Sequence, residues 1–184
     1  MKVALIIGHN EKSPGASNKA NNVSEFEFNE PLAFSVAQNL NDRGIEALVV
    51  YRDCSYKELP DKVNRTGADI AVSLHCNAFN GGAHGTEALY YKGSVKGRKL
   101  AQAIQDKVVK CLQLPDRGVK AKQTAHKGKA GDRGGILLKR TSMPCVIVEP
   151  FFIDSDKSLL LAVEKFEELS IAYADGIQAY FKAG

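Results

Sequence analysis

Short apolar runs alternate with longer amphipathic segments along most of the chain, and this alternation predicts strands followed by helices. The apolar runs predict strands at residues 2–7, 45–51, 68–74, 86–91, 136–139 and 145–148. Helical spacing predicts helices at residues 25–43, 56–65, 94–112 and 158–181, the last one with a break. The pattern is typical of α/β proteins, and the length of 184 residues suits one domain. We therefore expect a single domain with a twisted, mostly parallel sheet flanked by helices on both faces.

The first long helix has recognisable signals at both ends. Ser24 and Glu27 have the spacing of a capping box, which predicts a helix start at residue 25. Gly44 stands where a left-handed C-terminal cap favours glycine. Between these ends the large apolar residues recur every four positions, at Phe28, Leu32, Val36 and Leu40.

Charge narrows the classes of function. The chain has 25 basic and 21 acidic residues, and the net charge of +4 is too small to indicate nucleic acid binding by itself. Residues 117–140 nevertheless hold eight basic residues and one acid, which indicates either an anionic partner or a solvated loop. This stretch has no aromatic residue to stack on bases, so we expect no nucleic acid partner. We expect residues 113–135 to form a long irregular loop.

Membrane insertion and disulfide bonding are not expected. No apolar segment approaches the ~18–20 residues of a membrane helix, and the N-terminal apolar run is too short for a signal peptide. The cysteines show no CxxC spacing, which excludes a zinc ribbon or a thioredoxin motif. We expect buried or partly buried thiols at Cys54, Cys76, Cys111 and Cys145.

Three predicted strands are each followed by a strongly polar residue: His9, His75 and Glu149. Because sites in parallel sheets form at the carboxyl ends of strands, we expect these side chains to meet at one edge. Glu25, at the start of the first helix, can reach the same edge. Two imidazoles and a carboxylate with an open fourth position form a catalytic zinc set, and a second carboxylate supplies a general base. The residues alone also allow a plainer interpretation, in which the histidines are hydrogen-bonded structural residues.

Five segments, spread in order over the chain, form a recognisable set. They are IIGHN (6–10), SEFEFN (24–29), SLHCNA (73–78), HGTEALYY (84–91) and MPCVIVEPFFID (143–154). Together they resemble the zinc-dependent N-acetylmuramoyl-L-alanine amidases of the amidase type 3 family, which occur in endolysins and autolysins. The chain departs from the family pattern in the first segment, which lacks the usual D-x-G-H-G-G, and after Glu149, where a bulkier P-F-F replaces small residues.

The resemblance implies a function and a set of roles. His9, Glu25 and His75 would hold one zinc ion, and Glu149 would be the catalytic glutamate. The substrate would be peptidoglycan, cut at the amide between the lactyl group of N-acetylmuramic acid and L-alanine of the stem peptide. Zinc would polarise the carbonyl, while Glu149 would take a proton from the attacking water and pass it to the leaving amine. Residues 1–184 would form a single amidase catalytic domain without a separate cell-wall-binding module.

Several assignments are less specific. Glu27 competes with Glu25 as a ligand, although the motif favours Glu25. Asn77 is a candidate substrate-binding residue that we also expect to fix its own loop by side-chain hydrogen bonds. Arg140 is a candidate for binding a stem-peptide carboxylate, with a surface salt bridge as the alternative. Glu87, on a predicted strand, is interpreted as structural or substrate-facing.

Other polar residues near the motifs have plainer interpretations. His84 and His126 lie in glycine-bearing stretches and are expected to be solvated loop residues. Cys76 adjoins His75, but neighbouring residues on a strand point to opposite faces, so we do not expect a cysteine nucleophile.

Two other classes of function compete with the amidase. One is a non-catalytic peptidoglycan-binding or regulatory domain of the same fold, which would be marked by loss of a ligand or of the late glutamate. The other is a different zinc peptidase. With no signal peptide in the chain, we expect synthesis in the cytoplasm and action on the cell wall, through phage release, holin-dependent export or another route. The sequence leaves the oligomeric state open.

Overall fold

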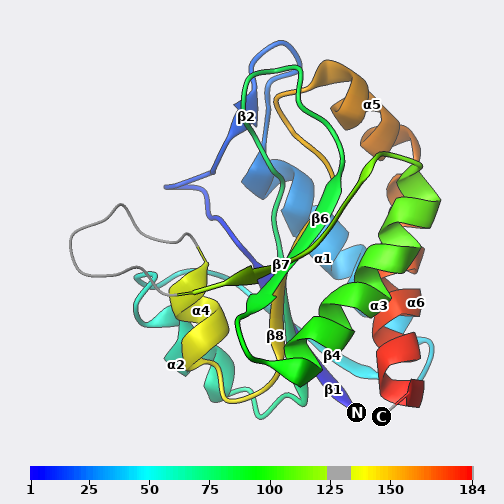
Figure 1. The fold of residues 1–184 in the computed structure, drawn as a ribbon. Helices are drawn as coiled ribbons and strands as arrows, with labels where there is room; N and C mark the ends of the chain where they lie inside the picture. Colours follow the sequence, from blue (N-terminus) through cyan, green and yellow to red (C-terminus); the bar gives the residue numbers. More distant parts are fainter. Residues whose placement is uncertain (124–133, 184) are drawn as a thin grey trace.

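A six-stranded mixed sheet forms the centre of the computed structural model, which describes residues 1–123 and 134–183 (Figure 1). In spatial order the strands are β4 (Glu46–Val50), β1 (Lys2–Ile7), β5 (Ile70–Leu74), β8 (Cys145–Glu149), β6 (Thr86–Tyr91) and β7 (Asp116–Lys122). The first four are parallel to one another, β6 is antiparallel to β8, and β7 is parallel to β6. The prediction of a mostly parallel sheet is therefore confirmed.

Helices cover both faces of this sheet, as the pattern predicted. Alternate residues of β1 enter two separate cores: Val3, Leu5 and Ile7 belong to one, and Ala4 and Ile6 to the other. The larger core is closed by α1 (Glu25–Asn41), α3 (Val95–Leu112) and α6 (Phe166–Ala183), and α5 (Asp156–Glu164) adds buried residues to it. The smaller core is closed by α2 (Leu59–Asn64) and α4 (Gly135–Arg140). None of the described helices combines the length and the apolar character needed to cross a membrane.

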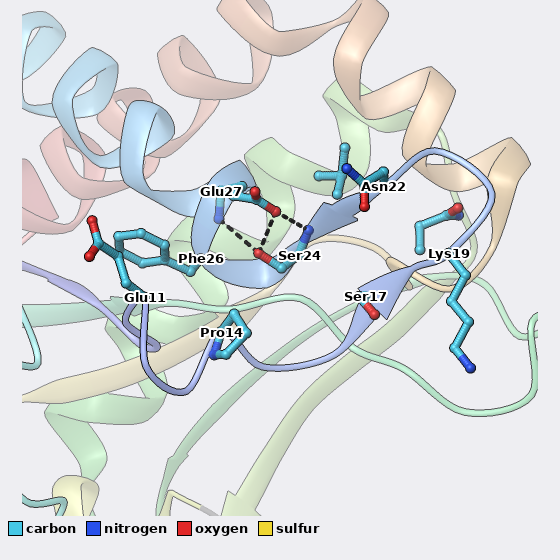
Figure 2. Close-up of a pocket in the computed structure, with 10 residues that line it drawn as sticks. Glu11, Pro14, Ser17, Lys19, Asn22, Ser24, Phe26 and Glu27 are labelled. Carbon is cyan, nitrogen blue, oxygen red and sulfur yellow. Dashed lines mark hydrogen bonds between the residues drawn. The ribbon is translucent and has the colours of Figure 1, made fainter.

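The start of α1 is held by the predicted capping box. The Ser24 hydroxyl accepts a hydrogen bond from the Glu27 amide at 3.3 Å, and the Glu27 carboxylate accepts one from the Ser24 amide at 2.8 Å (Figure 2). A two-stranded hairpin, β2 (Ser17–Asn18) with β3 (Val23–Ser24), leads into this cap. Glu25 thereby becomes the first residue of α1 and its position is fixed. At the other end, Gly44 follows the helix with φ of +73°, as its predicted role requires.

Two predicted elements differ from the structure. Residues 116–122, expected to lie in an irregular loop, form the edge strand β7, and residues 124–133 of that loop lie outside the described residues. The segment at 136–139, expected to be a strand, lies within helix α4. An edge strand needs only one paired side, so polar and half-exposed residues satisfy it, and a short apolar run has no period that separates strand from helix. The break expected in the last helix lies at Lys165, between α5 and α6.

Candidate active site

Two neighbouring parallel strands place the histidines side by side. His9 follows β1 after one glycine, and His75 follows β5 directly. The Gly8 amide donates to the Leu74 carbonyl at 3.1 Å, so the strand pairing continues to the point where both histidines emerge. The two imidazole rings are 5.1 Å apart between centroids and nearly perpendicular. This edge-to-face arrangement lets nitrogen atoms of both rings face one shared position.

Glu25 completes the group from the first turn of α1. One oxygen, Oε1, accepts a hydrogen bond from the Ala16 amide at 2.9 Å, and Oε2 accepts one from the Cys76 amide at 3.0 Å. Oε2 also lies 3.5 Å from His9 Nε2 and 3.4 Å from His75 Nδ1. The carboxylate is thus held by backbone amides while it faces both imidazoles.

This donor set fits a zinc ion. One ligand atom from each of His9, Glu25 and His75 lies within 4.8 Å of the others. His9 Nδ1 is 3.1 Å from the Ser13 carbonyl, so it acts as the donor and leaves Nε2 with a lone pair for a metal. Burial lowers the pKa of His9, which favours the neutral imidazole that metals bind. Burial opposes ionisation of Glu25, but its contacts with the histidines lower its pKa and favour the carboxylate.

Two glycines make room for this cluster. A Cβ on Gly8 would lie 2.1 Å from His75 Nε2, which is far inside van der Waals contact. Gly15 has φ of +84°, and a Cβ there would lie 2.8 Å from Glu25 Oε1 and 2.9 Å from His9 Cδ2. The loop after β1 can therefore close against the ligands only because these positions have no side chain.

Glu149 ends β8 beside the metal-site candidate. The side-chain nitrogen Nδ2 of Asn77 donates to Glu149 Oε2 at 2.9 Å, and the Asn77 side-chain oxygen accepts from the Ala78 backbone amide at 2.9 Å. Asn77 therefore fixes its own loop, as expected, and also orients the glutamate. Burial raises the pKa of Glu149 to about 7. A carboxyl group of this kind can both accept and release a proton near neutral pH.

The antiparallel pairing of β6 with β8 brings a second carboxylate to Glu149. Glu87 is the register partner of Glu149, and its Oε2 accepts from Arg117 Nε at 2.5 Å and from Lys120 Nζ at 2.6 Å. Sequence reasoning missed both cations because it placed them in a loop. The alternation of basic residues at 120 and 122 is typical of a strand and could have indicated Lys120, but it does not include Arg117.

A cavity of about 540 Å³ joins these groups. Its lining includes His9, Glu25, His75, Asn77 and Glu149. The cavity also reaches Arg52, Tyr56 and Lys122, which sequence reasoning did not single out. One cavity at the carboxyl edge of the parallel strands therefore holds the three assigned ligands and the assigned catalytic glutamate. It also holds Asn77, one of the two candidate substrate-binding residues.

Arg140 does not line this cavity. It ends α4, where its guanidinium lies 3.1 Å from the Lys57 carbonyl and 3.4 Å from the Asp61 carboxylate. This location favours the surface salt bridge over the contact with a stem-peptide carboxylate. Glu27 is used by the capping box, so the structure places Glu25, and not Glu27, with the histidines.

The remaining polar candidates are also located. His84 is exposed, with Nδ1 3.2 Å from the Gly82 carbonyl, and His126 lies outside the described residues. Cys76 is buried, with its sulfur 3.5 Å from the Asn29 side-chain amide. Burial raises the pKa of the Cys76 thiol well above its ordinary value, so the group is unsuited to act as a nucleophile.

Comparisons with known proteins identify the family of this chain. Residues 3–179 match the model of a family described as N-acetylmuramoyl-L-alanine amidase. An uncharacterized cell wall amidase of Bacillus anthracis is 35% identical over 125 residues, covering 62% of this chain and 21% of that protein. An endolysin of Bacillus phage SPP1 is 31% identical over 186 residues, covering 95% of this chain and 64% of that protein.

Solved structures show the same fold. The crystal structure of N-acetylmuramoyl-L-alanine amidase from Clostridium difficile 630 superposes with a TM-score of 0.86 at 25% identity, covering 99% of this chain and 97% of that one. The chain spans less than two thirds of the length of the Bacillus anthracis and phage proteins. Because the family model covers nearly all of the sequence, the chain belongs to the N-acetylmuramoyl-L-alanine amidase family.

Proposed function

We propose that this chain is a zinc-dependent peptidoglycan hydrolase. It cuts the amide between the lactyl group of N-acetylmuramic acid and L-alanine of the stem peptide. The observation that carries the proposal is the convergence of His9, Glu25 and His75 in one cavity with Glu149. Membership in the amidase family supports the choice of bond.

The chemistry divides between the ligand set and the glutamate. His9, Glu25 and His75 would hold the zinc ion, which when bound supplies a Lewis acid and lowers the pKa of water from 15.7 to about 7. Glu149, oriented by Asn77, accepts a proton from the attacking water. It then donates that proton to the amide nitrogen, so that the peptide leaves as a neutral amine. One residue serves both steps because its pKa lies near 7.

Product analysis tests the bond. Purified peptidoglycan is digested with and without a chelator, and the products are identified by mass spectrometry. We expect free stem peptides that begin with L-alanine, and only when metal is available. Cleavage elsewhere would mean a different hydrolase, and no cleavage would favour the non-catalytic binding domain.

Substitutions distinguish the proposed metal ligands from the general acid–base residue. Glu149→Gln should keep zinc and fold but lose activity on the order of 10²–10⁴-fold, because it removes the general acid–base group. Glu25→Gln should lose zinc affinity, whereas Glu27→Gln, its matched control on the same helix, should keep it. Zinc content by atomic emission and turnover on peptidoglycan provide the two readouts. Full activity of Glu149→Gln would contradict its assignment.

We also propose that the protein acts on the cell wall as an endolysin or an autolysin. The phage SPP1 relative, which is named an endolysin, supports this setting. An endolysin made in the cytoplasm would need release through a holin or another route. Expression inside a susceptible host with and without a holin tests this, because rapid lysis should require the holin.

A further inference from the structure

A second groove opens beside the catalytic cavity. It has a volume of about 650 Å³ and is lined by the loop at residues 77–83 together with Glu87, Arg117 and Phe152. Asn77, Ala78 and Glu87 line both this groove and the catalytic cavity, so the two lie next to each other. We call it the Arg117 groove.

The groove contains a cation that the catalytic chemistry does not use. Arg117 donates through Nε to Glu87, and its guanidinium lies 5.0 Å from the centroid of the Phe152 ring. These contacts fix the plane of the guanidinium, while its terminal nitrogens have no protein acceptor among residues 1–123 and 134–183. Two cations, Arg117 and Lys120, share the single Glu87 carboxylate, which leaves one excess positive charge. A fixed guanidinium with open terminal donors suits a carboxylate.

The groove is also lined by an exposed aromatic residue, Phe79, on a hydrogen-bonded loop. Phe79 is 80% exposed, which is unusual for a large apolar residue. Its backbone amide and that of Gly81 both donate to the Asp154 carboxylate at 2.9 Å. Asn80 caps the same turn by accepting from the Gly82 and Ala83 amides. The ring is therefore presented to solvent by a loop with its own hydrogen bonds.

We propose that the Arg117 groove binds the peptide part of the substrate, with Arg117 paired to a peptide carboxylate and Phe79 packed against the peptide chain. This inference rests on the proposed function. In the bond assigned above, the lactyl carboxyl group is consumed by the amide, so the glycan side is neutral and the remaining carboxylates belong to the peptide. The groove also begins at Asn77, which holds the glutamate that protonates the leaving amine. The leaving group in that step is the peptide.

A third groove carries a net negative charge. It lies between the segment that follows His9 and the start of α1, and its volume is about 570 Å³ (Figure 2). Its charged residues are Glu11, Lys19 and Glu27, so carboxylates outnumber cations. This balance disfavours an anionic peptide there and leaves the Arg117 groove as the better peptide site.

The test compares peptidoglycan before and after amidation of its free carboxylates. The material is first stripped of other anionic wall polymers, and the apparent KM is measured from the release of new L-alanine amino termini. We expect amidation to raise the apparent KM of the wild-type protein about tenfold, as loss of a charge-assisted pair would. Arg117→Gln should show that higher KM on untreated substrate and no further response to amidation. Arg117→Lys should recover part of the response.

Lys120→Gln is the matched control, because Lys120 binds the same Glu87 oxygen but does not line the groove. It should keep the response to amidation. Phe79→Ala should raise the KM about threefold on both substrates, because an aromatic contact does not depend on the carboxylate. An Arg117→Gln protein that responds to amidation like the wild type would overturn the inference while leaving the amidase intact. An effect of Arg117→Gln seen only when anionic wall polymers are present would assign the groove to those polymers instead. A wild-type protein that releases no L-alanine termini would refute the proposed function itself.

Discussion

Replacement of Gly8 by alanine should disable the proposed zinc site while the fold survives. The added Cβ would lie 2.1, 2.2 and 2.5 Å from His75 Nε2, Cε1 and Cδ2. Ordinary contact begins at 3.4 Å, so the ring has to move by about 1.3 Å, the difference between 3.4 and 2.1. The glycine itself has little freedom to retreat, because its amide donates to the Leu74 carbonyl at 3.1 Å.

A shift of this size exceeds what a metal site tolerates. Ligand distances in metal sites hold within about 0.2 Å, so the displaced ring of His75 no longer serves as a ligand. We expect zinc affinity to fall by more than about 100-fold, since changes in the outer shell alone cost 10–100-fold. The overpacking itself should lower the free energy of unfolding by only about 1–3 kcal/mol. Competition with a chelating dye measures the affinity, and circular dichroism with urea unfolding measures the fold.

Gly44→Ala is the control for general destabilisation. A Cβ there meets nothing within 4 Å, but the φ of +73° strains any residue with a side chain. The variant should lose about 1–2 kcal/mol of stability and keep its zinc affinity. A folded Gly8→Ala protein that binds zinc as tightly as the wild type would refute the steric argument.

Three further predictions concern stability. Ser24→Ala should lower the free energy of unfolding by about 1 kcal/mol, because it removes the capping box; an unchanged urea midpoint would count against this. Tyr173→Phe should be neutral or stabilising, because the buried hydroxyl has no partner among the described residues; a loss above about 1 kcal/mol would show that a partner exists. Burial opposes ionisation of Glu87, but Arg117 and Lys120 lower its pKa. Its contribution to stability is therefore present above the ordinary carboxyl pKa of 4.5 and is lost as pH falls through the lower native pKa. Glu87→Gln should flatten the pH dependence of stability below pH 4.5, and an unchanged slope there would contradict the pairing.

The sequence by itself determined most of the parallel core and the positions of the key side chains. Apolar runs that end at His9, His75 and Glu149 predicted strand ends, and parallel strands bring such ends to one edge. The capping box predicted the start of α1, and with it the place of Glu25. These features depend on the periodicity of apolar residues and on local hydrogen bonds. Both involve residues that are close together in the sequence.

Other features were decided only by the tertiary structure. The Glu25 carboxylate is held by the Cys76 amide, 51 positions away, and the pairing of Glu87 with Glu149 depends on the reversed direction of β6. Arg117 became part of the site only because β7 adds to the edge of the sheet. None of these contacts produces a periodic pattern in the sequence, because each depends on which strands pair and in which direction. Local patterns determine which face of a helix or strand is buried, but the packing of elements distant in the sequence determines which of them lie beside it.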